Sequence, residues 1–417
     1  MEKRATFLII VLLVVAIGPR SAGAQRESSA RPRADGTAIV PFKIQVPDSV
    51  LSDLKHRLAR TRFPGEIPGS GWDYGTNLTY LKDLVTYWRD AFDWRAAERR
   101  LNQFEQFKTR IDGLDIHFIH RRSRNANALP LVLTHGWPGS FVEFTKVIGP
   151  LTDPVGHGGR AEDAFHVVAI SLPGFGFSAK PSERGYGPKR MAGIIATLMA
   201  RLGYSRYGVQ GGDWGSAISR FVALDDPSHV VGLHLNFCLA APPAGAKDPN
   251  EGVAPAELER MRARQTFFDG ERGYFQIQST KPQTIGYALD DSPAGLAAWI
   301  VEKFRSWCDC GGDVEKKFTK DELLTNITIY WATETATSSA RIYYENQRAA
   351  GSPPGRVEVP TACAVFPKEI NIPPRRWVEA SYNLTRWTEM PRGGHFAALE
   401  EPGLLVDDLR TFFRNLR

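Results

Sequence analysis

Short apolar runs alternate with amphipathic stretches along much of the chain from about residue 107 onward. Runs typical of buried strands are Leu114–Arg121, Leu129–Thr134, Phe165–Leu172, Arg206–Gln210 and Val230–Phe237. Stretches with helical periodicity separate them, notably Phe141–Leu151 and Lys189–Leu202. Because strands that alternate with helices form parallel sheets covered on both faces, the pattern predicts an α/β fold with a mostly parallel sheet.

The alternation stops between about residues 240 and 359, where amphipathic helices dominate. The predicted helices of this segment are Pro255–Phe267, Ser292–Trp307 and Lys320–Tyr344. A strand at Thr361–Phe366 and a final helix at Leu404–Arg414 then resume the pattern. We therefore expect a core in two parts, residues 108–239 and residues 360–417, with a helical lid inserted at residues 240–359.

Residues 38–107 precede this core and are rich in aromatic side chains, with helical periodicity in Ser49–Thr61 and Leu78–Leu101. Aromatic-rich helices of this kind more often serve packing than ligand binding. The block predicts an N-terminal helical segment that wraps on the main domain.

The first 24 residues have the pattern of a secretory signal peptide. Lys3 and Arg4 precede the apolar run Phe7–Ile17, and Ala22-Gly23-Ala24 offers a small-residue cleavage site. The apolar run is short for a membrane helix, which needs ~20 residues. We expect cleavage, a disordered linker at residues 25–37 and an exported protein, secreted or periplasmic; an uncleaved membrane anchor is the alternative.

The formal net charge of +6 is scattered, and its basic clusters are short, as at Arg99-Arg100 and Arg121-Arg122. This distribution predicts a solvated surface rather than a nucleic-acid site. The cysteines are Cys238, Cys308, Cys310 and Cys363. Their spacing does not match a zinc site and implies no disulfide, although export would permit one; Cys308 and Cys310 are expected to be too close for an unstrained bridge.

The most informative motif is Gly211-Gly212-Asp213-Trp214-Gly215, between a predicted strand and a predicted helix. It has the form of a nucleophile elbow, with aspartate where serine is usual. Serine attack on an sp³ carbon would leave an ether, whereas carboxylate attack leaves an ester that water can cleave. Asp213 therefore predicts substitution at carbon, with an epoxide or a haloalkane as the electrophile.

A carboxylate nucleophile needs oxyanion donors and a base. His135-Gly136-Trp137-Pro138-Gly139 closes a strand, and backbone N–H groups of Trp137 and Trp214 are candidate oxyanion donors. The candidate base is His395, on the glycine loop Gly393-Gly394-His395-Phe396 before the last helix. His135 competes with it, but lies before the nucleophile, on the wrong side of the expected chain order.

The base needs a carboxylate to orient it, and Glu369 follows the Thr361–Phe366 strand. A plain surface glutamate is the competing interpretation, and Glu345 and Asp321 are weaker candidates inside the predicted lid. The lid must also supply an acid for the leaving oxygen, a role that suits tyrosine. The lid tyrosines are Tyr274, Tyr287, Tyr330, Tyr343 and Tyr344.

These motifs, in this order, resemble the microsomal and juvenile-hormone epoxide hydrolases of the α/β-hydrolase superfamily. Further matches are Leu172-Pro173-Gly174-Phe175-Gly176-Phe177-Ser178, Gly273-Tyr274, Glu302-Lys303-Phe304 and Tyr343-Tyr344-Glu345-Asn346. The resemblance covers nearly everything after the linker. It implies an α/β-hydrolase core, Asp213 as nucleophile, His395 as base and Glu369 as its partner. It also implies Tyr274 and Tyr343 as lid acids, with Tyr344 as the neighbouring alternative to Tyr343.

We therefore predict an epoxide hydrolase that converts lipophilic epoxides to vicinal diols through an aspartyl ester. The resemblance implies no cofactor; the expected partners are the epoxide and water, not nucleic acid, with membrane association and oligomeric state left open. Alternatives are a haloalkane dehalogenase, for which Trp214 could bind halide, and a non-catalytic binding protein of the same fold. A serine esterase is disfavoured because Ser216 follows the elbow instead of occupying its tip.

Overall fold

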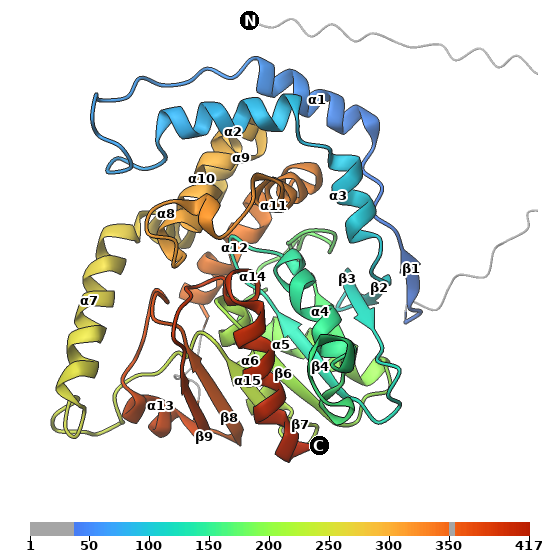
Figure 1. Cartoon of the computed structure of the whole chain (residues 1–417), viewed down its shortest axis with the longest axis vertical. Helices are drawn as coiled ribbons and strands as arrows, with labels where there is room; N and C mark the ends of the chain where they lie inside the picture. The colour runs from blue at the N-terminus through green and yellow to red at the C-terminus, as the bar shows by residue number, and fades with distance from the viewer. Residues whose placement is uncertain (1–36, 350–354) are drawn as a thin grey trace, which may run out of the picture. The chain divides into compact units, whose positions relative to one another are not determined.

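A computed structural model describes residues 37–349 and 355–417. The predicted signal peptide or anchor, and the predicted linker up to residue 36, lie outside these residues. The unit Thr37–Arg417 is built on a nine-stranded sheet in the order β1-β2-β3-β5-β4-β6-β7-β8-β9 (Figure 1). The strands are β1 Val40–Phe42, β2 Gln106–Ile111, β3 Leu114–Arg121, β4 Leu129–Thr134, β5 Phe165–Ile170, β6 Tyr207–Gly211, β7 Val230–Leu235, β8 Val357–Val365 and β9 Tyr382–Glu389.

Strands β4 to β9 run parallel to one another, whereas β1, β2 and β3 pair antiparallel at one edge. The predicted mostly parallel α/β sheet is therefore confirmed. The interior parallel strands β4 to β7 are almost wholly buried, as in β5, where only His166 is partly exposed. This burial explains their continuous apolar runs, because both faces of a parallel sheet are covered.

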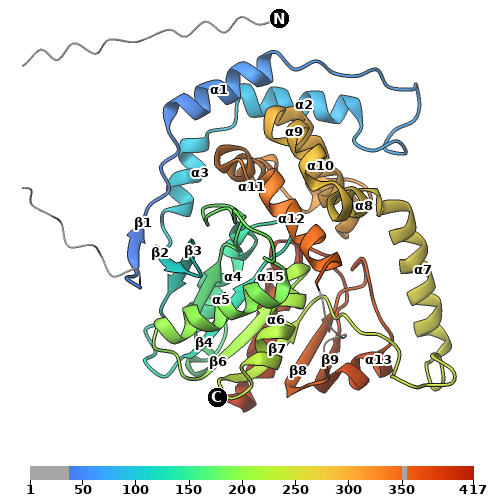
Figure 2. The same ribbon diagram turned by 180° about the vertical axis from the view of Figure 1, so that it is seen from behind.

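Helices cover both faces of the sheet. Helices α4 (Thr145–Thr152) and α15 (Pro402–Phe413) lie on the face seen in Figure 1, and α5 (Pro188–Arg201) and α6 (Trp214–Asp225) lie on the other, seen in Figure 2. Two shorter helices, α13 (Arg375–Ser381) and α14 (Ala397–Glu400), flank β9 in the chain.

The sequence did not predict strands β1, β2 and β9. Of these, β9 changes the topology. It is an edge strand whose residues are mostly half-exposed, so it has no continuous apolar run. The last strand of the sheet is therefore β9, not the predicted Thr361–Phe366 strand, which is the second half of β8.

Most of the segment between β7 and β8 is helical. Its helices are α7 Pro255–Glu271, α8 Gly273–Thr280, α9 Pro282–Asp291, α10 Pro293–Trp307, α11 Lys320–Thr333 and α12 Ala336–Gln347. The single stretch predicted at Lys320–Tyr344 is in fact two helices. The helix is interrupted at Glu334. This residue has a left-handed backbone conformation, with φ 52°, which ends α11.

Helices α1 (Asp48–Ala59), α2 (Leu78–Asp90) and α3 (Trp94–Leu101) form the N-terminal segment. The predicted Leu78–Leu101 stretch is divided because Asp93 caps a new helix, accepting a hydrogen bond from Ala96 N. Trp88 Nε1 donates to Thr328 Oγ1 of α11 at 3.0 Å. The segment thus packs in part on the lid helices as well as on the core (Figure 1).

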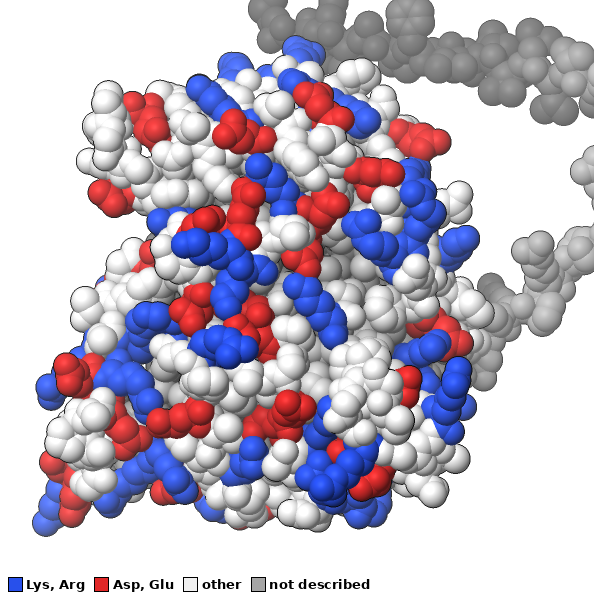
Figure 3. All heavy atoms as spheres, in the orientation of Figure 1, with Lys and Arg blue, Asp and Glu red and all other residues white. Residues whose placement is uncertain are grey.

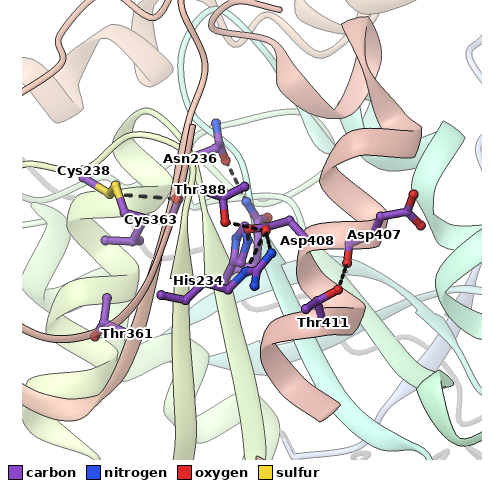
Figure 4. A network of polar contacts seen from close by, with 12 residues as sticks. His234, Asn236, Cys238, Thr361, Cys363, Thr388, Asp407, Asp408 and Thr411 are labelled. Carbon is purple, nitrogen blue, oxygen red and sulfur yellow. Dashed lines mark hydrogen bonds and ion pairs between the residues drawn. A yellow bond between two sulfur atoms is a disulfide. The ribbon is translucent and has the colours of Figure 1, made fainter. Parts of the chain in front are cut away.

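A buried polar network ties the last helix to the sheet (Figure 4). Asp408 of α15 lies 3.0 Å from His234 Nε2 of β7 and accepts hydrogen bonds from Arg386 and Thr388 of β9. Because these partners satisfy the buried carboxylate, the network fixes β9 and α15 against β7.

Both cysteine pairs are bonded in the structure. Cys238, just after β7, is joined to Cys363 of β8 (Figure 4), and Cys308 is joined to Cys310. The spacing of the cysteines implied no disulfide, so the sequence did not predict either bond. The turn that follows α10 sets the Cα atoms of Cys308 and Cys310 5.3 Å apart, an ordinary disulfide spacing.

Lysine and arginine are interspersed with aspartate and glutamate over the face seen in Figure 3. Within residues 37–349 and 355–417, no helix has both the length and the apolar character that a bilayer span requires.

Candidate active site

The candidate residues meet at the carboxyl ends of the parallel strands, where open α/β sheets bind their ligands. Trp137 follows β4, Asp213 follows β6, Glu369 follows β8 and His395 follows β9. Two lid helices, α8 and α12, complete the site with Tyr274 and Tyr343.

Asp213 lies on a sharp turn between β6 and α6, with φ 50° and ψ −130°. Non-glycine residues rarely adopt such a conformation, which the surrounding structure must enforce. The neighbouring glycines are required by close packing: a Cβ on Gly215 would overlap the carbonyl of Thr134, and one on Gly136 would overlap the Asp213 carboxylate. The elbow therefore presents the Asp213 side chain at the top of the sheet.

Each oxygen of the Asp213 carboxylate faces a different group. Trp137 N–H donates to Oδ1 at 2.8 Å, and His395 Nε2 lies 3.4 Å from Oδ2. Trp214 is the first residue of α6, so its N–H belongs to the amides that a helix N-terminus leaves free. Of the predicted oxyanion donors, Trp137 N–H contacts the carboxylate directly, and Trp214 N–H directly follows Asp213 at the start of α6.

His395 lies between Asp213 and Glu369. Its Nδ1 is 2.6 Å from Glu369 Oε1, and both side chains are buried. The weaker carboxylate candidates lie elsewhere, because Glu345 accepts from Gly185 N and Asp321 accepts from Tyr87. The structure therefore brings Glu369, and not its rivals, to the imidazole.

His135, the competing histidine, lies beneath the site. Its Nδ1 contacts the Gly136 carbonyl, and Leu172 N–H donates to its Nε2. Burial lowers the pKa of His135 to about 4. Both ring nitrogens are engaged in neutral hydrogen bonds, so His135 is suited to holding the turn rather than to proton transfer.

The environment of His395 favours its charged form. Burial alone would lower the pKa of His395, but the charge of Glu369 and the contacts with Asp213 and Glu369 raise it well above its ordinary value. In the resting site the imidazolium is therefore held between two carboxylates.

Tyr274 and Tyr343 form an aromatic wall opposite the elbow. Trp137 stacks on the Tyr274 ring with centroids 5.1 Å apart, and the Trp214 ring meets Tyr343 edge-on at 4.8 Å. Among the described residues the Tyr343 hydroxyl has no hydrogen-bond partner. Burial and then other nearby groups, including the negative charge of Asp213, raise the pKa of both phenols, which keeps them protonated as hydrogen-bond donors.

The other lid tyrosines lie outside this wall. The Tyr330 hydroxyl donates to the Gly139 carbonyl at 2.7 Å, and Tyr287 is exposed to solvent. Tyr344 contacts Arg348, whose guanidinium carbon lies 3.5 Å from the centroid of the Tyr344 ring. Of the adjacent pair, the structure places Tyr343 at the site.

Two polar residues near the nucleophile were not predicted from the sequence as site residues. Glu143 and Asn236 line a small cavity with Asp213 and His395. Burial raises the pKa of Glu143 to about 8. Glu143 lies in a single 3₁₀ turn after the Gly136–Pro138 loop, and Asn236 directly follows β7. The only sequence feature that points to Asn236 is its position directly after a predicted strand. No such feature points to Glu143.

This arrangement combines a nucleophilic carboxylate, two phenol donors and a histidine–carboxylate pair. The phenols can stabilise an oxygen that leaves carbon, and the imidazole can activate water against an ester of Asp213. The geometry therefore suits a two-step displacement at carbon.

Comparison with known proteins agrees with this geometry. A family model described as "Epoxide hydrolase N terminus" matches residues 39–144, and one described as "alpha/beta hydrolase fold" matches residues 130–275. Epoxide hydrolase 1 of Sus scrofa is 44% identical over 405 residues, covering 91% of this chain and 89% of that protein.

Solved structures agree as well. The juvenile hormone epoxide hydrolase of the silkworm Bombyx mori superposes with a TM-score of 0.84 at 34% identity, covering 91% of this chain and 95% of that one. The Aspergillus niger epoxide hydrolase gives 0.81 at 34% identity, with 92% and 97% covered. The chain therefore belongs to the epoxide hydrolase family of the α/β-hydrolase fold.

Proposed function

We propose that this epoxide hydrolase converts lipophilic epoxides to vicinal diols through a covalent ester on Asp213. The observation that carries the proposal is the position of Asp213 between two unlike sets of groups. His395 and Glu369 lie on one side, and Tyr274 and Tyr343 form the wall on the other. Only a displacement at carbon followed by ester hydrolysis uses both sets.

In the first step an Asp213 oxygen attacks the less hindered ring carbon, and the carbon–oxygen bond of the ring breaks. The departing oxygen receives a hydrogen bond and then a proton from the tyrosine pair. The His395 imidazolium of the resting site then returns a proton, through water, to the tyrosinate, which leaves His395 neutral for the second step. Because Trp137 N–H already holds Oδ1, the carboxylate is oriented before the substrate arrives.

In the second step His395 takes a proton from water, whose oxygen attacks the ester carbonyl carbon. The backbone N–H groups of Trp137 and Trp214 stabilise the oxyanion that forms there. Collapse of this intermediate breaks the ester carbon–oxygen bond, and the His395 imidazolium protonates the departing alkoxide to release the diol. The Asp213 acid, now holding one oxygen from water, then gives its proton to His395, which restores the carboxylate and the imidazolium of the resting site. The sum of the two steps is the addition of one water molecule to the epoxide.

The walls around Asp213 support a lipophilic substrate. Trp137, Trp214, Tyr274 and Tyr343 surround the carboxylate with aromatic surface. Tyr274 also lies on the wall of a larger groove, ≈ 1210 Å³ in volume, between α1, residues 61–76 and helices α8 to α10. We propose this groove as the access route for the substrate.

A haloalkane dehalogenase would use the same aspartate and histidine, so the two activities need a direct comparison. Purified protein incubated with styrene oxide should yield the diol, and with a chloroalkane it should release no chloride. Chloride release without diol formation would favour the dehalogenase.

Removal of either lid hydroxyl should slow ring opening. We expect Tyr274→Phe and Tyr343→Phe each to lower kcat/KM by roughly tenfold to a hundredfold, because one donor to the departing oxygen remains. The double variant should lose more than either. Tyr287→Phe, at an exposed lid position, is the control and should match the wild type. Equal loss in the control and the test variants would contradict the assignment.

The two steps should differ in their dependence on pH. Ester formation neutralises Asp213 and so removes one of the charges that raise the pKa of His395 in the resting enzyme. In the ester intermediate, His395 is protonated below its pKa and cannot accept a proton from water. The rate of ester hydrolysis should therefore fall about tenfold for each pH unit below that pKa.

Rapid-quench measurement of ester decay across the range from about pH 5 to pH 9 would define this acid limb. An NMR titration of His395 in the free enzyme supplies the reference. We expect the rate of ester hydrolysis to fall at a lower pH than the pH at which His395 titrates in the free enzyme. Coincidence of the two would contradict a charge effect of Asp213.

The proposed location of the protein is outside the cytoplasm, after cleavage of residues 1–24. The basic start, the apolar run and the small-residue site support this proposal. N-terminal sequencing of the protein expressed from its full gene should begin at Gln25. A membrane-bound protein that retains Met1 would favour the anchor.

A further inference from the structure

All four backbone amides of the loop that carries His395 donate hydrogen bonds. Gly394 N–H and Phe396 N–H donate to the two oxygens of Glu400, at 3.0 and 2.9 Å. His395 N–H donates to the Trp307 carbonyl at 3.0 Å. Gly393 N–H donates to Asp309 Oδ2 at 2.9 Å. The base is therefore held by its backbone as well as by Glu369.

Glu400 is the centre of this arrangement. Its buried carboxylate accepts from the amides on both sides of His395 and also from Asp309 N–H, at 2.9 Å. Burial raises the pKa of Glu400 to about 7, and the three amide hydrogen bonds oppose this rise. One side chain thus connects the catalytic loop to the residues that end the lid helix α10.

The same residues of the lid contact the acid side of the site. The Trp307 ring lies 5.2 Å from the Tyr274 ring and 5.0 Å from the His395 ring, measured between centroids. Asp309 follows two residues later, inside the turn closed by Cys308 and Cys310. A shift of this turn would therefore move the loop of the base together with the surroundings of the acid.

Other contacts hold the loop as well: the Phe396 ring stacks on Phe304 with centroids 4.0 Å apart, and Lys368 N–H donates to the Gly393 carbonyl. Gly393 has a φ of 107°, and a Cβ on Gly394 would overlap the Trp307 carbonyl, so the loop follows the lid turn closely. Glu369 holds only the far end of the imidazole, at Nδ1. Without the acceptors on Glu400, three buried amides would lack partners, and the loop would shift to satisfy them.

We propose that Glu400 is a positioning residue for His395, which sets the base against the Asp213 ester and couples it to the lid. The inference rests on the proposed role of His395 as the base. It predicts that Glu400 acts on ester hydrolysis and not on ester formation, because only the second step needs the imidazole as a proton acceptor.

The test variant is Glu400→Gln, which keeps the size of the side chain but replaces one acceptor oxygen with an NH₂ group facing an amide donor. Rapid quench with styrene oxide, followed by intact-protein mass spectrometry, measures both steps. We expect ester hydrolysis to slow roughly tenfold to a hundredfold, because displacements of about 1 Å have effects of this size. Ester formation should stay within about threefold of the wild type, so the ester accumulates.

The acid limb of ester hydrolysis gives a second readout. Above its pKa of about 7, Glu400 places a negative charge beside His395. Loss of that charge should lower the pKa of the imidazole, and the pH at which ester hydrolysis falls should move lower. If the variant only reduced the amount of folded protein, the rates of both steps would fall together. The pH dependence of ester hydrolysis would then stay as in the wild type.

Asp408→Asn provides the matched control. Asp408 is another buried carboxylate with several hydrogen bonds, but its partners are His234, Arg386 and Thr388 of the β7–β9–α15 network (Figure 4), not the amides of the His395 loop. We expect this variant to lower the thermal midpoint while both steps of the folded enzyme keep their wild-type rates.

If Glu400→Gln does not fold, Glu400→Asp decides the question. It keeps the carboxylate but withdraws it by one methylene from the amides of Gly394, Phe396 and Asp309, and it should slow ester hydrolysis alone, by roughly threefold to tenfold. Unchanged ester hydrolysis in the folded variants, or equal slowing of both steps, would overturn the role of Glu400. Absence of any ester in the wild type would instead refute the proposed function.

Discussion

Replacement of His395 by glutamine is expected to stop the reaction at the aspartyl ester. Ring opening needs the Asp213 carboxylate and the tyrosines, whereas the second step needs a base to activate water. The variant should therefore lose at least about a thousandfold in turnover while it still reacts once with the epoxide. The intact protein should gain the mass of one substrate molecule, and peptide mapping should place that increment on Asp213.

His234→Gln is the matched control for this experiment. His234 is also buried and also contacts a carboxylate, but that carboxylate is Asp408 of the β7–β9–α15 network (Figure 4), not Asp213. The control should lose stability without trapping an ester. If His395→Gln showed no mass increment with a reactive epoxide, or turned over at the control's rate, His395 would not be the base.

Replacement of Asp213 by alanine is expected to have the largest effect of all. No other carboxylate follows β6 at the elbow, and the neighbouring Glu143 has a pKa raised to about 8, which keeps it mainly protonated near neutrality. Both ester formation and diol release should fall at least about ten-thousandfold, as in other enzymes that lose their nucleophile. Gas chromatography of the diol and intact-protein mass would measure the two losses.

Asp225→Ala, at the far end of the same helix, controls for the loss of a carboxylate in α6. It should retain wild-type activity. Substantial diol formation by Asp213→Ala, with the thermal midpoint close to that of the control, would show that water attacks the epoxide directly.

Features with strict local requirements were predictable from the chain. The tight turn at Asp213 needs glycine on either side, so the elbow has a sequence signature. The buried parallel strands have continuous apolar runs, which also predict the carboxyl ends where Trp137 and Glu369 lie. The catalytic roles of these residues stay predictions until the variants are measured.

Features that depend on contacts distant in sequence could not be predicted in this way. Edge strand β9 is half-exposed and lacks a continuous apolar run. The pairing of Cys308 with Cys310 depends on the turn that ends α10. Glu400 contacts backbone amides, and any segment can supply an amide, so no residue pattern marks its partners.

The most direct measurement uses a single turnover of excess enzyme over epoxide in water enriched in oxygen-18. Because water attacks the carbonyl carbon of the ester, one heavy oxygen should appear in the Asp213 carboxylate, and the diol should carry the original carboxyl oxygen. Mass spectrometry of the peptide that contains Asp213 would detect the label. Heavy oxygen in the diol alone, with an unlabelled Asp213, would contradict the ester mechanism.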